Sequence, residues 1–331
     1  MAQQTHDMYF ADEKAHRRWK IGFYSSRIFI YLFLTLFGLF IILPFWFMIV
    51  TSLKAPNIYT HELSHGVSLW VSEPTFHNFQ VIFGIVTEDG RVIAELTAEE
   101  YRQAEINGQI SSSYNFGRYF LNTFIFATVS TALTVITTVL AAFAFARLDF
   151  KGKNALFAVL IATMMVPGEM MIITNYQTIM GFGWKDTFAG LILTNFVSIF
   201  YIFYLRQTFA TIPNELYLAS KVDGYGEFEY LWKVMIPIAF PTITTITILS
   251  VMGAWNAFIW PNLVANGTHP IFGNDMRLVS NGLMSIFSAQ AQGKDTIMVA
   301  GSMVVTAPLI LIFILFRRYI MRGISRSGIK G

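Results

Sequence analysis

The segment His61-Glu62-Leu63-Ser64-His65 holds the residue pattern most suggestive of catalysis. On a helix, histidines four residues apart place both imidazoles on one face, where they can bind zinc while the glutamate acts as a general base. His77 or Glu73 offers a third ligand. However, Pro56 and Gly66 bracket a short polar stretch that does not predict a stable helix. We therefore expect a hydrated loop without a bound metal, and keep a membrane zinc metalloprotease using His61, Glu62 and His65 as an alternative.

Nucleotide and thiol chemistry have no matching pattern in this chain. A phosphate-binding loop reads Gly-x-x-x-x-Gly-Lys-Ser/Thr. Here Gly152-Lys153 is followed by Asn154, and Arg147 stands at the first glycine position. The absence of cysteine excludes thiolate metal sites, cysteine nucleophiles and disulfides. We predict a chain that is not an enzyme and binds no cofactor of its own.

The composition indicates a membrane protein. Hydrophobic residues make up 54% of the 331 residues and charged residues only 13%, whereas soluble domains carry about a quarter charged residues. The formal net charge is +3. The basic residues lie beside apolar runs instead of gathering on one predicted face, which favours membrane topology and argues against a nucleic-acid partner. The main partner predicted from composition is therefore the lipid bilayer.

Six apolar stretches are long enough to cross a membrane. About 20 residues are needed, because each helical residue rises about 1.5 Å and the hydrocarbon is about 30 Å thick. The stretches cover residues 28–50, 119–145, 156–179, 188–209, 238–264 and 297–316. No cleavage pattern follows the first stretch, so we expect it to remain in the protein. The sequence predicts an all-α membrane protein with six transmembrane helices.

The basic residues orient these helices. With the N and C termini in the cytoplasm, only seven of the 23 Lys and Arg residues fall in outer loops: Lys54, Arg91, Arg102, Arg118, Lys185, Arg277 and Lys294. The others lie inside, including those of the short connection 147–153, as the positive-inside rule requires. The predicted parts are a cytoplasmic N-terminal segment 1–27, a first transmembrane helix 28–50, an extracytoplasmic loop 51–118, a core 119–317 with a cytoplasmic loop 207–237, and a cytoplasmic tail 318–331.

The loop 213–237 carries the most specific pattern in the chain. It resembles the coupling loop of ABC importer permeases, which reads Glu-Ala-Ala, three residues, Gly, nine residues, Ile-x-Leu-Pro. The residues in register are Ala219, Ser220, Gly224, Val234, Ile236 and Pro237, whereas Leu218 replaces the leading glutamate. Other segments resemble the carbohydrate branch of this family, specifically its smaller, maltose-type permease subunit: residues 43–54, 121–123, 141–147, 164–169, 255–261 and 318–324.

The resemblance implies a fold, a function and partners. The fold is the ABC type-1 importer transmembrane domain. The function is that of a permease subunit of an ATP-driven, binding-protein-dependent sugar importer, multi-pass in a bacterial or archaeal cell (inner) membrane. The partners are a second permease subunit, two ATP-binding subunits that hold ATP and Mg, and an extracytoplasmic solute-binding protein. The residues expected to couple to the ATPase are Glu215, Leu218, Ala219, Ser220, Asp223, Gly224 and Pro237.

The coupling loop is predicted to form two helices. Pro213 suits the start of the first, and Gly224 can take the left-handed turn that ends it. In the second helix, the apolar residues at i, i+3, i+4 and i+7 are Phe228, Leu231, Trp232 and Met235. This stripe predicts an amphipathic helix packed under the membrane domain.

Polar residues at membrane depth suggest a translocation path. Glu169 is the clearest ionisable group, beside Pro167-Gly168, where a broken helix can expose backbone to a cavity. Asn175, Trp255 and Asn256 add hydrogen-bonding and stacking groups. No Arg or Lys is predicted there to hold an anion. A neutral sugar is therefore the predicted substrate, with glycerol 3-phosphate or another small solute as the alternative.

Overall fold

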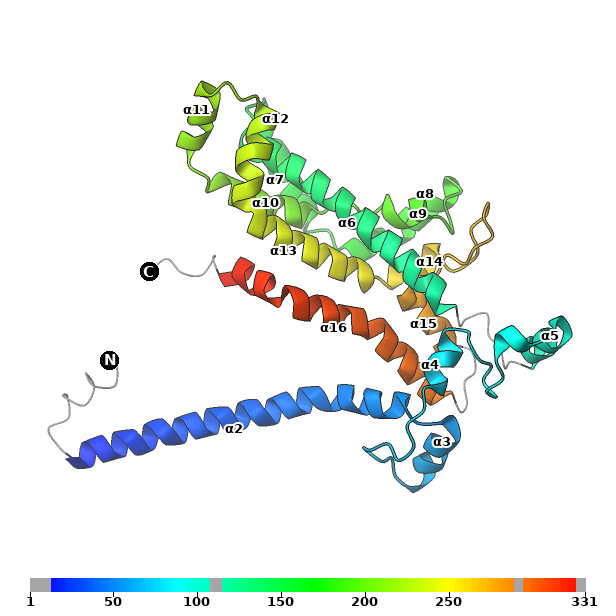
Figure 1. The fold of residues 1–331 in the computed structure, drawn as a ribbon. Helices are drawn as coiled ribbons and strands as arrows, with labels where there is room; N and C mark the ends of the chain where they lie inside the picture. The colour runs from blue at the N-terminus through cyan, green and yellow to red at the C-terminus, as the bar shows by residue number, and fades with distance from the viewer. Residues whose placement is uncertain (1–12, 108–114, 289–293, 326–331) are drawn as a thin grey trace.

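All regular secondary structure in the described part of the chain is helical. A computed structural model describes residues 13–107, 115–288 and 294–325 (Figure 1). Within these ranges the β pairings are two isolated bridges, Val86 with Val92 and Thr268 with Asp275. The predicted all-α class is confirmed.

Runs of short helices separate the long helices along the described chain. In order they are α2 (Glu13–Ser52), α3 (Pro56–His65), α4 (His77–Ile82), η2 (Ile93–Glu95), α5 (Ala98–Ile106), α6 (Phe116–Ala146), α7 (Lys153–Thr163), η3 (Gly168–Met171), α8 (Ile172–Gly181), α9 (Phe188–Ile192), α10 (Ile199–Ala210), α11 (Asn214–Val222), α12 (Glu227–Tyr230), η4 (Leu231–Met235), α13 (Ile236–Trp255), α14 (Ile259–Val264), α15 (Val279–Ser288) and α16 (Asp295–Ser325).

Within the described residues, four helical segments have the length and apolarity to cross a membrane. They are Trp19–Ser52, Phe116–Ala146, Glu227–Trp255 and Asp295–Arg317. A fifth candidate combines α7 with the η3–α8 pair, which are bent by 86° at their junction. Single straight helices therefore account for fewer spans than the six predicted from apolarity.

Three of the predicted stretches are interrupted. Residues 156–179 divide at 164–167, residues 188–209 divide at 193–198 between α9 and α10, and residues 238–264 divide at 256–258 between α13 and α14. Apolar composition predicts burial in lipid, whereas proline and short polar side chains decide whether the backbone hydrogen bonds continue. The sequence pattern suggested only the first of these breaks.

Helix α6 is the centre of the bundle. It packs against α10 and α13. Ala142 and Phe143 of α6, Leu205 and Phe209 of α10, and Ala239 of α13 lie in one buried cluster. Small residues such as Ala142 and Ala239 let helices approach closely, which is how helices associate where lipid removes the hydrophobic driving force.

Helix α2 stands apart from the bundle over most of its length. It begins at Glu13, earlier than the predicted span, and continues through Pro44. None of the residues in its most apolar window is buried. Only its last turn is covered, where Thr51 and Ser52 are fully buried and the Ser52 hydroxyl lies 3.4 Å from the Met303 sulfur of α16. Figure 1 shows α2 diverging from α16 toward its N-terminal end.

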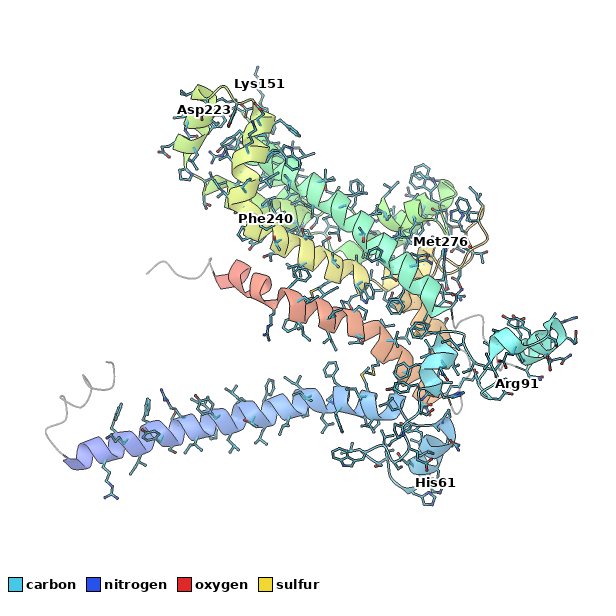
Figure 2. The ribbon with its side chains drawn as sticks, in the orientation of Figure 1. His61, Arg91, Lys151, Asp223, Phe240 and Met276 are labelled. Carbon is cyan, nitrogen blue, oxygen red and sulfur yellow. The ribbon has the colours of Figure 1, made fainter. Side chains whose placement is uncertain are left out.

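The start of α2, the end of α16 and the coupling loop lie toward the same end of the molecule. In Figure 1 the start of α2, the end of α16 and the α11–α12 loop lie on the left, whereas α3, α4 and α5 lie on the right. Figure 2 labels Lys151 and Asp223 at the first end and His61 and Arg91 at the other. This arrangement agrees with the distribution of basic residues along the sequence.

The described residues of the predicted outer loop, 51–107 and 115–118, include several short helices and the start of α6. Residues 56–65 form helix α3, so the expectation of a non-helical loop at His61–His65 is wrong, although this stretch is largely exposed, as expected. Pro56 opens the helix, and the N–H of Gly66, at φ 114°, donates to the carbonyl of Glu62. Tertiary contacts of α3 with α16 stabilise a helix too short to be predicted from local sequence.

Candidate functional site

A cavity of about 740 Å³ opens where the three interrupted helices meet. Each interruption supplies part of its wall. The contributing residues are Gly168 and Glu169 of η3, Asn195 and Ser198 between α9 and α10, and Asn256, Ala257 and Phe258 between α13 and α14. Irregular backbone at membrane depth is tolerated where it lines a cavity of this kind.

The first interruption follows from Pro167. Proline lacks an N–H and disfavours helical conformation at the residue before it. Helix α7 accordingly ends at Thr163, and a 3₁₀ turn begins at Gly168, with the Met170 N–H donating to the Pro167 carbonyl at 3.1 Å. Glu169 lies on this turn and is exposed to the cavity.

The second interruption follows from short polar side chains. The Asn195 side-chain amide donates to the Thr194 hydroxyl at 3.0 Å. The Ser198 hydroxyl accepts from the Tyr201 N–H at 3.4 Å and caps the start of α10. Such side chains offer the backbone an alternative to helical hydrogen bonds, so α9 ends and α10 begins anew.

The third interruption exposes a carbonyl that another helix satisfies. Helix α13 ends at Trp255, and the Asn256 side chain donates to the Met252 carbonyl at 2.9 Å. The Ala257 carbonyl, which has no helical partner, accepts from the Ser280 hydroxyl of α15 at 2.5 Å. A freed backbone group inside a membrane protein needs such a partner, so α15 stabilises the break.

The rest of the described wall is largely apolar and carries a few polar groups, none of them charged. Hydroxyl groups come from Ser130, Thr134 and Ser250, and aromatic rings come from Phe126 and Trp260. Together with the amides of the interruptions, these groups can donate to and accept from the hydroxyls of a polyhydroxylated solute and pack against its apolar faces.

Three of the four predicted path residues line this cavity. Glu169, Asn175 and Asn256 do, whereas Trp255 does not. Trp255 is 7% exposed and its indole N–H donates to the Val305 carbonyl of α16 at 3.1 Å. Its large apolar ring is better accommodated between helices than in a hydrated cavity.

Sequence analysis missed the contribution of α6 to the cavity. Ser130 and Thr134 are four residues apart and therefore on one face of this helix. The available signal was the spacing of these two hydroxyl residues, within a helix that carries several other threonines.

The first helix of the coupling loop, α11, has a capped C-terminal end. Asp223 ends α11, and Gly224 follows at φ 80°. The Gly224 N–H donates to the Lys221 carbonyl at 3.1 Å, and the Tyr225 N–H donates to the Ser220 carbonyl at 2.8 Å. These two bonds form a Schellman motif, which favours glycine at the left-handed position.

Helix α11 is attached to α12 by side-chain contacts. The Tyr217 hydroxyl donates to the Glu227 carboxylate at 2.8 Å, and the Lys221 ammonium lies 2.7 Å from the same carboxylate oxygen. Glu227 raises the pKa of Lys221 through this hydrogen bond. The Tyr217 ring also contacts the buried Tyr230 ring, edge to face, with centroids 5.1 Å apart. The two helices therefore form one unit.

The predicted apolar stripe of the second helix is only partly correct. Leu231 and Met235 are buried, as expected, but Phe228 and Trp232 are exposed and Tyr230 is buried in their place. Residues 231–235 form a π-helical turn, η4. A π turn shifts the side chains that follow relative to a 3.6-residue period, so a stripe drawn on that period selects the wrong face.

Arg147 fixes the coupling loop to the bundle. Its guanidinium donates to the carbonyls of Phe209, at 3.3 Å, and Ile212. Those carbonyls belong to the end of α10 and to the connection that leads into α11. The end of α6 thus holds the start of the coupling loop.

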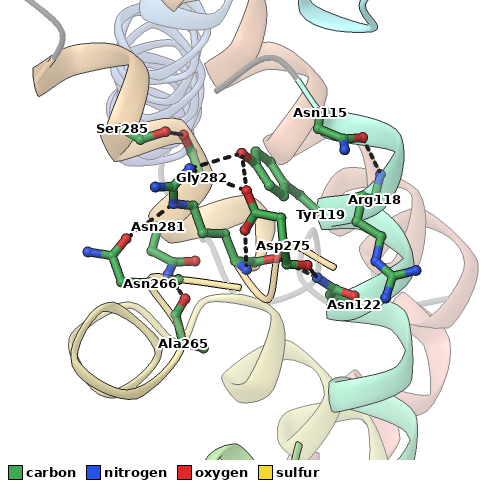
Figure 3. Close-up of polar contacts among 12 residues, drawn as sticks. Asn115, Arg118, Tyr119, Asn122, Ala265, Asn266, Asp275, Asn281, Gly282 and Ser285 are labelled. Atoms are coloured by element: carbon green, nitrogen blue, oxygen red, sulfur yellow. Dashed lines mark hydrogen bonds and ion pairs between the residues drawn. The ribbon is translucent and has the colours of Figure 1, made fainter. Parts of the chain in front are cut away.

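A polar cluster fixes the opposite end of α6 to the segment before α15 (Figure 3). The Tyr119 hydroxyl donates to the Asp275 carboxylate at 3.2 Å, and Arg277 pairs with the same carboxylate at 3.3 Å. The buried Asn122 amide donates to the carbonyls of both Asp275 and Arg277, at 2.8 and 2.9 Å. Gly282 packs against the Tyr119 ring. This cluster positions α15, which supports the third interruption.

A known protein family matches this chain. The model of a family described as "Binding-protein-dependent transport system inner membrane component" matches residues 135–326, more than half of the chain. The chain belongs to this family. The matched residues include the coupling loop and most of the cavity wall.

Several permeases are similar in sequence to this chain. Arabinooligosaccharides transport system permease protein AraQ of Bacillus subtilis (strain 168) is 29% identical over 65% of this chain and 74% of its own. Diacetylchitobiose uptake system permease protein NgcG of Streptomyces coelicolor is 30% identical over 65% and 70%. sn-Glycerol-3-phosphate transport system permease protein UgpE of Yersinia pestis bv. Antiqua is 26% identical over 66% and 75%. The resemblance to carbohydrate ABC importer permeases is confirmed.

The fold of this chain has a counterpart in a solved structure. A chain of a bacterial ABC transporter involved in the import of the acidic polysaccharide alginate superposes with a TM-score of 0.69 at 18% identity. The match covers 89% of this chain and 97% of that chain. The ABC importer permease fold therefore extends beyond the residues of the family match.

Most of the permease residues expected to couple to an ATPase are exposed on the coupling loop. Glu215, Leu218, Ala219, Asp223, Gly224 and Pro237 are on the surface. Ser220 is buried, and its hydroxyl donates to the Tyr217 carbonyl at 2.7 Å. Leu218, which replaces the family's glutamate, is 57% exposed and adds apolar surface to the loop.

The His-Glu-x-x-His segment of the permease is engaged in structure. The Glu62 carboxylate accepts from the Lys54 ammonium at 2.5 Å and from the Ser68 N–H at 3.2 Å, and Lys54 is 2% exposed. The rings of His61 and His65 stack with centroids 4.4 Å apart. Among the described residues no three His, Asp or Glu side chains are grouped to hold a metal ion. The glutamate that would act as general base is instead the partner of a buried lysine.

Proposed function

We propose that this chain is a permease subunit of an ATP-driven, binding-protein-dependent sugar importer in a bacterial or archaeal cell membrane, where it forms half of the translocation path. The observation that carries the proposal is the cavity at which three helices are interrupted, because its walls present amides and hydroxyls without a basic residue among the described lining side chains. The sugar permeases among its relatives support the same conclusion.

The membrane arrangement that fits this function has six spans. Helices α2, α6, α13 and α16 cross singly, while α7 with α8 and α9 with α10 each make one broken span. Both termini are then cytoplasmic. The shared position of the α2 start, the α16 end and the coupling loop supports this arrangement (Figure 1).

Coupling would follow the rigid path through α11, α12 and α13. Two partner ATP-binding subunits hold ATP and Mg, and their closure moves α11 by contact with its exposed residues. Because Tyr217 and Lys221 attach α11 to Glu227, the movement passes into α12 and α13. The far end of α13 is Trp255, next to Asn256 in the cavity wall. Movement at the coupling loop is thereby delivered to the translocation path.

The test begins with the partners. We expect a tagged chain, purified from gently solubilised membranes, to bring a second permease and an ATP-binding subunit that mass spectrometry identifies. Recovery of the chain alone with stoichiometric zinc would instead support the metalloprotease alternative. An extracytoplasmic solute-binding protein is then added to the reconstituted complex.

Substrate competition in proteoliposomes tests the cargo. Neutral arabino-oligosaccharides or diacetylchitobiose should compete for ATP-dependent uptake, since relatives are named for them. Glycerol 3-phosphate is the second candidate because UgpE is also a relative. Uptake inhibited by glycerol 3-phosphate and by no neutral sugar would favour that candidate.

A further inference from the structure

The cavity carries one formal charge among its described lining residues, and that charge is negative. Glu169 supplies it, and no Lys, Arg or His is among the described lining side chains. Glu169 forms no ion pair within the described residues. The carboxylate is therefore available to a solute that enters.

Two arginines on the surrounding helices, Arg206 and Arg147, have partners of their own. Arg206 of α10 stacks over the Phe157 ring at 4.2 Å and donates to the Phe145 carbonyl at 3.4 Å. Arg147 donates to carbonyls at the coupling loop. Neither guanidinium is free to neutralise the cavity.

Apolar walls strengthen the effect of the carboxylate. Phe126, Ile172 and Phe258 line the same cavity. A charge between low-dielectric walls is screened less than one on an open surface, and a cleft lined by one sign of charge concentrates ions of the opposite sign.

We propose that Glu169 makes the cavity selective by charge, admitting neutral and cationic sugars such as amino sugars and repelling anionic ones such as uronic acids and sugar phosphates. Hydroxyl and ammonium groups can donate to its carboxylate, whereas a substrate carboxylate or phosphate cannot. The inference rests on the proposed function, because it names the class of sugar that this path accepts.

The experiment measures charge inside the cavity directly. Because the chain has no cysteine, Ser198→Cys places a single thiol in the wall. The purified importer complex is treated with cationic and anionic methanethiosulfonates of similar size, and the ratio of their reaction rates is divided by the ratio for a free thiol. We expect the cationic reagent to be favoured about tenfold, as for a cleft lined by one sign of charge.

Two substitutions in the Ser198→Cys background connect the ratio to Glu169. Glu169→Gln should lower the normalised rate ratio to about one. Glu169→Asp keeps the charge and should preserve the preference for the cationic reagent. Ser72→Cys, on the exposed outer segment, is the control and should not respond to either substitution.

Transport separates this inference from the proposed function. In the wild-type importer, an anionic sugar should inhibit uptake less strongly than its neutral counterpart. Glu169→Gln should make the two sugars more alike in how strongly they inhibit uptake. A rate ratio at Ser198→Cys that is the same with Glu169 and with Gln overturns the charge selectivity, even if neutral sugars are transported. Absence of uptake for every sugar would overturn the proposed function, whatever the ratio.

Discussion

Gly282 packs so closely against the Tyr119 ring that it has no room for a side chain. A Cβ at this position would lie 2.4 Å from the Tyr119 ring, which is fully buried and held by Asp275 and Arg277 (Figure 3). We expect Gly282→Ala to destabilise the protein by about 1–3 kcal/mol, because a tightly packed site must distort to accept a methyl group. Thermal unfolding of the detergent-purified protein measures this.

A second glycine provides the control for that change. Gly117 lies in α6, and a Cβ there would meet nothing within 4 Å. Gly117→Ala should leave the unfolding temperature unchanged or raise it slightly, because alanine favours helix. Equal unfolding temperatures for the two variants would contradict the packing argument.

We expect Glu62 to make the position of α3 sensitive to acid. The hydrogen bond from Lys54 lowers the pKa of Glu62. A carboxyl with a lowered folded-state pKa stabilises the fold above its unfolded pKa of about 4.3, and this stability is lost as the pH falls through the folded value. We expect α3 to stay docked at pH 5 and above and to loosen below about pH 4. A spin label at Thr60→Cys reports its mobility.

Two neighbouring carboxylates separate this effect from general acid sensitivity. Glu62→Gln should make the label at residue 60 mobile already at neutral pH, because the buried Lys54 loses its charged partner. Glu73→Gln, in the exposed part of the same segment, should leave the pH response unchanged. A response that survives in Glu62→Gln would assign it to another group.

At the residue scale, the sequence pointed to the polar side chains of the cavity but did not predict the direction of Trp255. Glu169, Asn175 and Asn256 face the cavity. Trp255 is adjacent to Asn256 in sequence but turns toward α16, because the α13 helix ends between them. The orientation of a residue beside a helix break depends on tertiary contacts that a linear pattern does not contain.

Pro167 is the element-scale test of the cavity. It stands at the 86° bend between α7 and the η3–α8 pair, and Glu169 lies just beyond it. Pro167→Ala restores an N–H and removes a steric barrier to helix, so the bend should straighten and the cavity wall should move. We expect membrane insertion to persist and transport to fall at least tenfold, as measured by uptake in proteoliposomes.

Pro308 is the matched control for that substitution. It lies inside α16 without interrupting the helix. Pro308→Ala should therefore retain most of the transport activity. Full transport by Pro167→Ala would show that the bend is not required for the path.

Gly224 tests the turn of the coupling loop. Its φ of 80° is left-handed, whereas Gly226 has φ −71°, and a Cβ at either residue would meet nothing within 4 Å. Gly224→Ala should thus strain the backbone by about 1–2 kcal/mol, and Gly226→Ala should not. In the assembled importer we expect Gly224→Ala to reduce transport per ATP hydrolysed. Equal coupling in the two variants would contradict the role of the turn.

At the scale of elements, hydropathy predicted the apolar stretches and not where the helices within them stop. Residues 188–209 are apolar enough to suggest one span, yet Asn195 and Ser198 divide it. The π turn at 231–235 likewise changed which residues of the second coupling helix are buried. Averages of apolarity detect neither the hydrogen bonds of Asn195 and Ser198 nor the change of helical period at the π turn.

The whole molecule has a predicted orientation that single cysteines can test. In spheroplasts, a membrane-impermeant maleimide should label cysteines placed at Ser72, Lys185 and Ile271, which the six-span arrangement puts outside. Cysteines placed at Lys151 and Asn214 should react only after the membrane is permeabilised. All five positions are exposed in the structure, so shielding within the described chain does not prevent the reaction. Labelling of Lys151→Cys from outside would contradict the orientation.

The isolation of α2 has a consequence for how this sequence can change over time. Because α2 touches the bundle only near its final turn, most of its side chains share no packing partner within the described chain. Its positions should drift independently under selection, exchanging one apolar residue for another as long as the helix stays hydrophobic. In α6, by contrast, a replacement at Ala142 or Tyr119 has to be matched by changes on other helices. Among related sequences, α2 would then keep only its apolar composition, whereas substitutions in α6 would be correlated with substitutions on other helices.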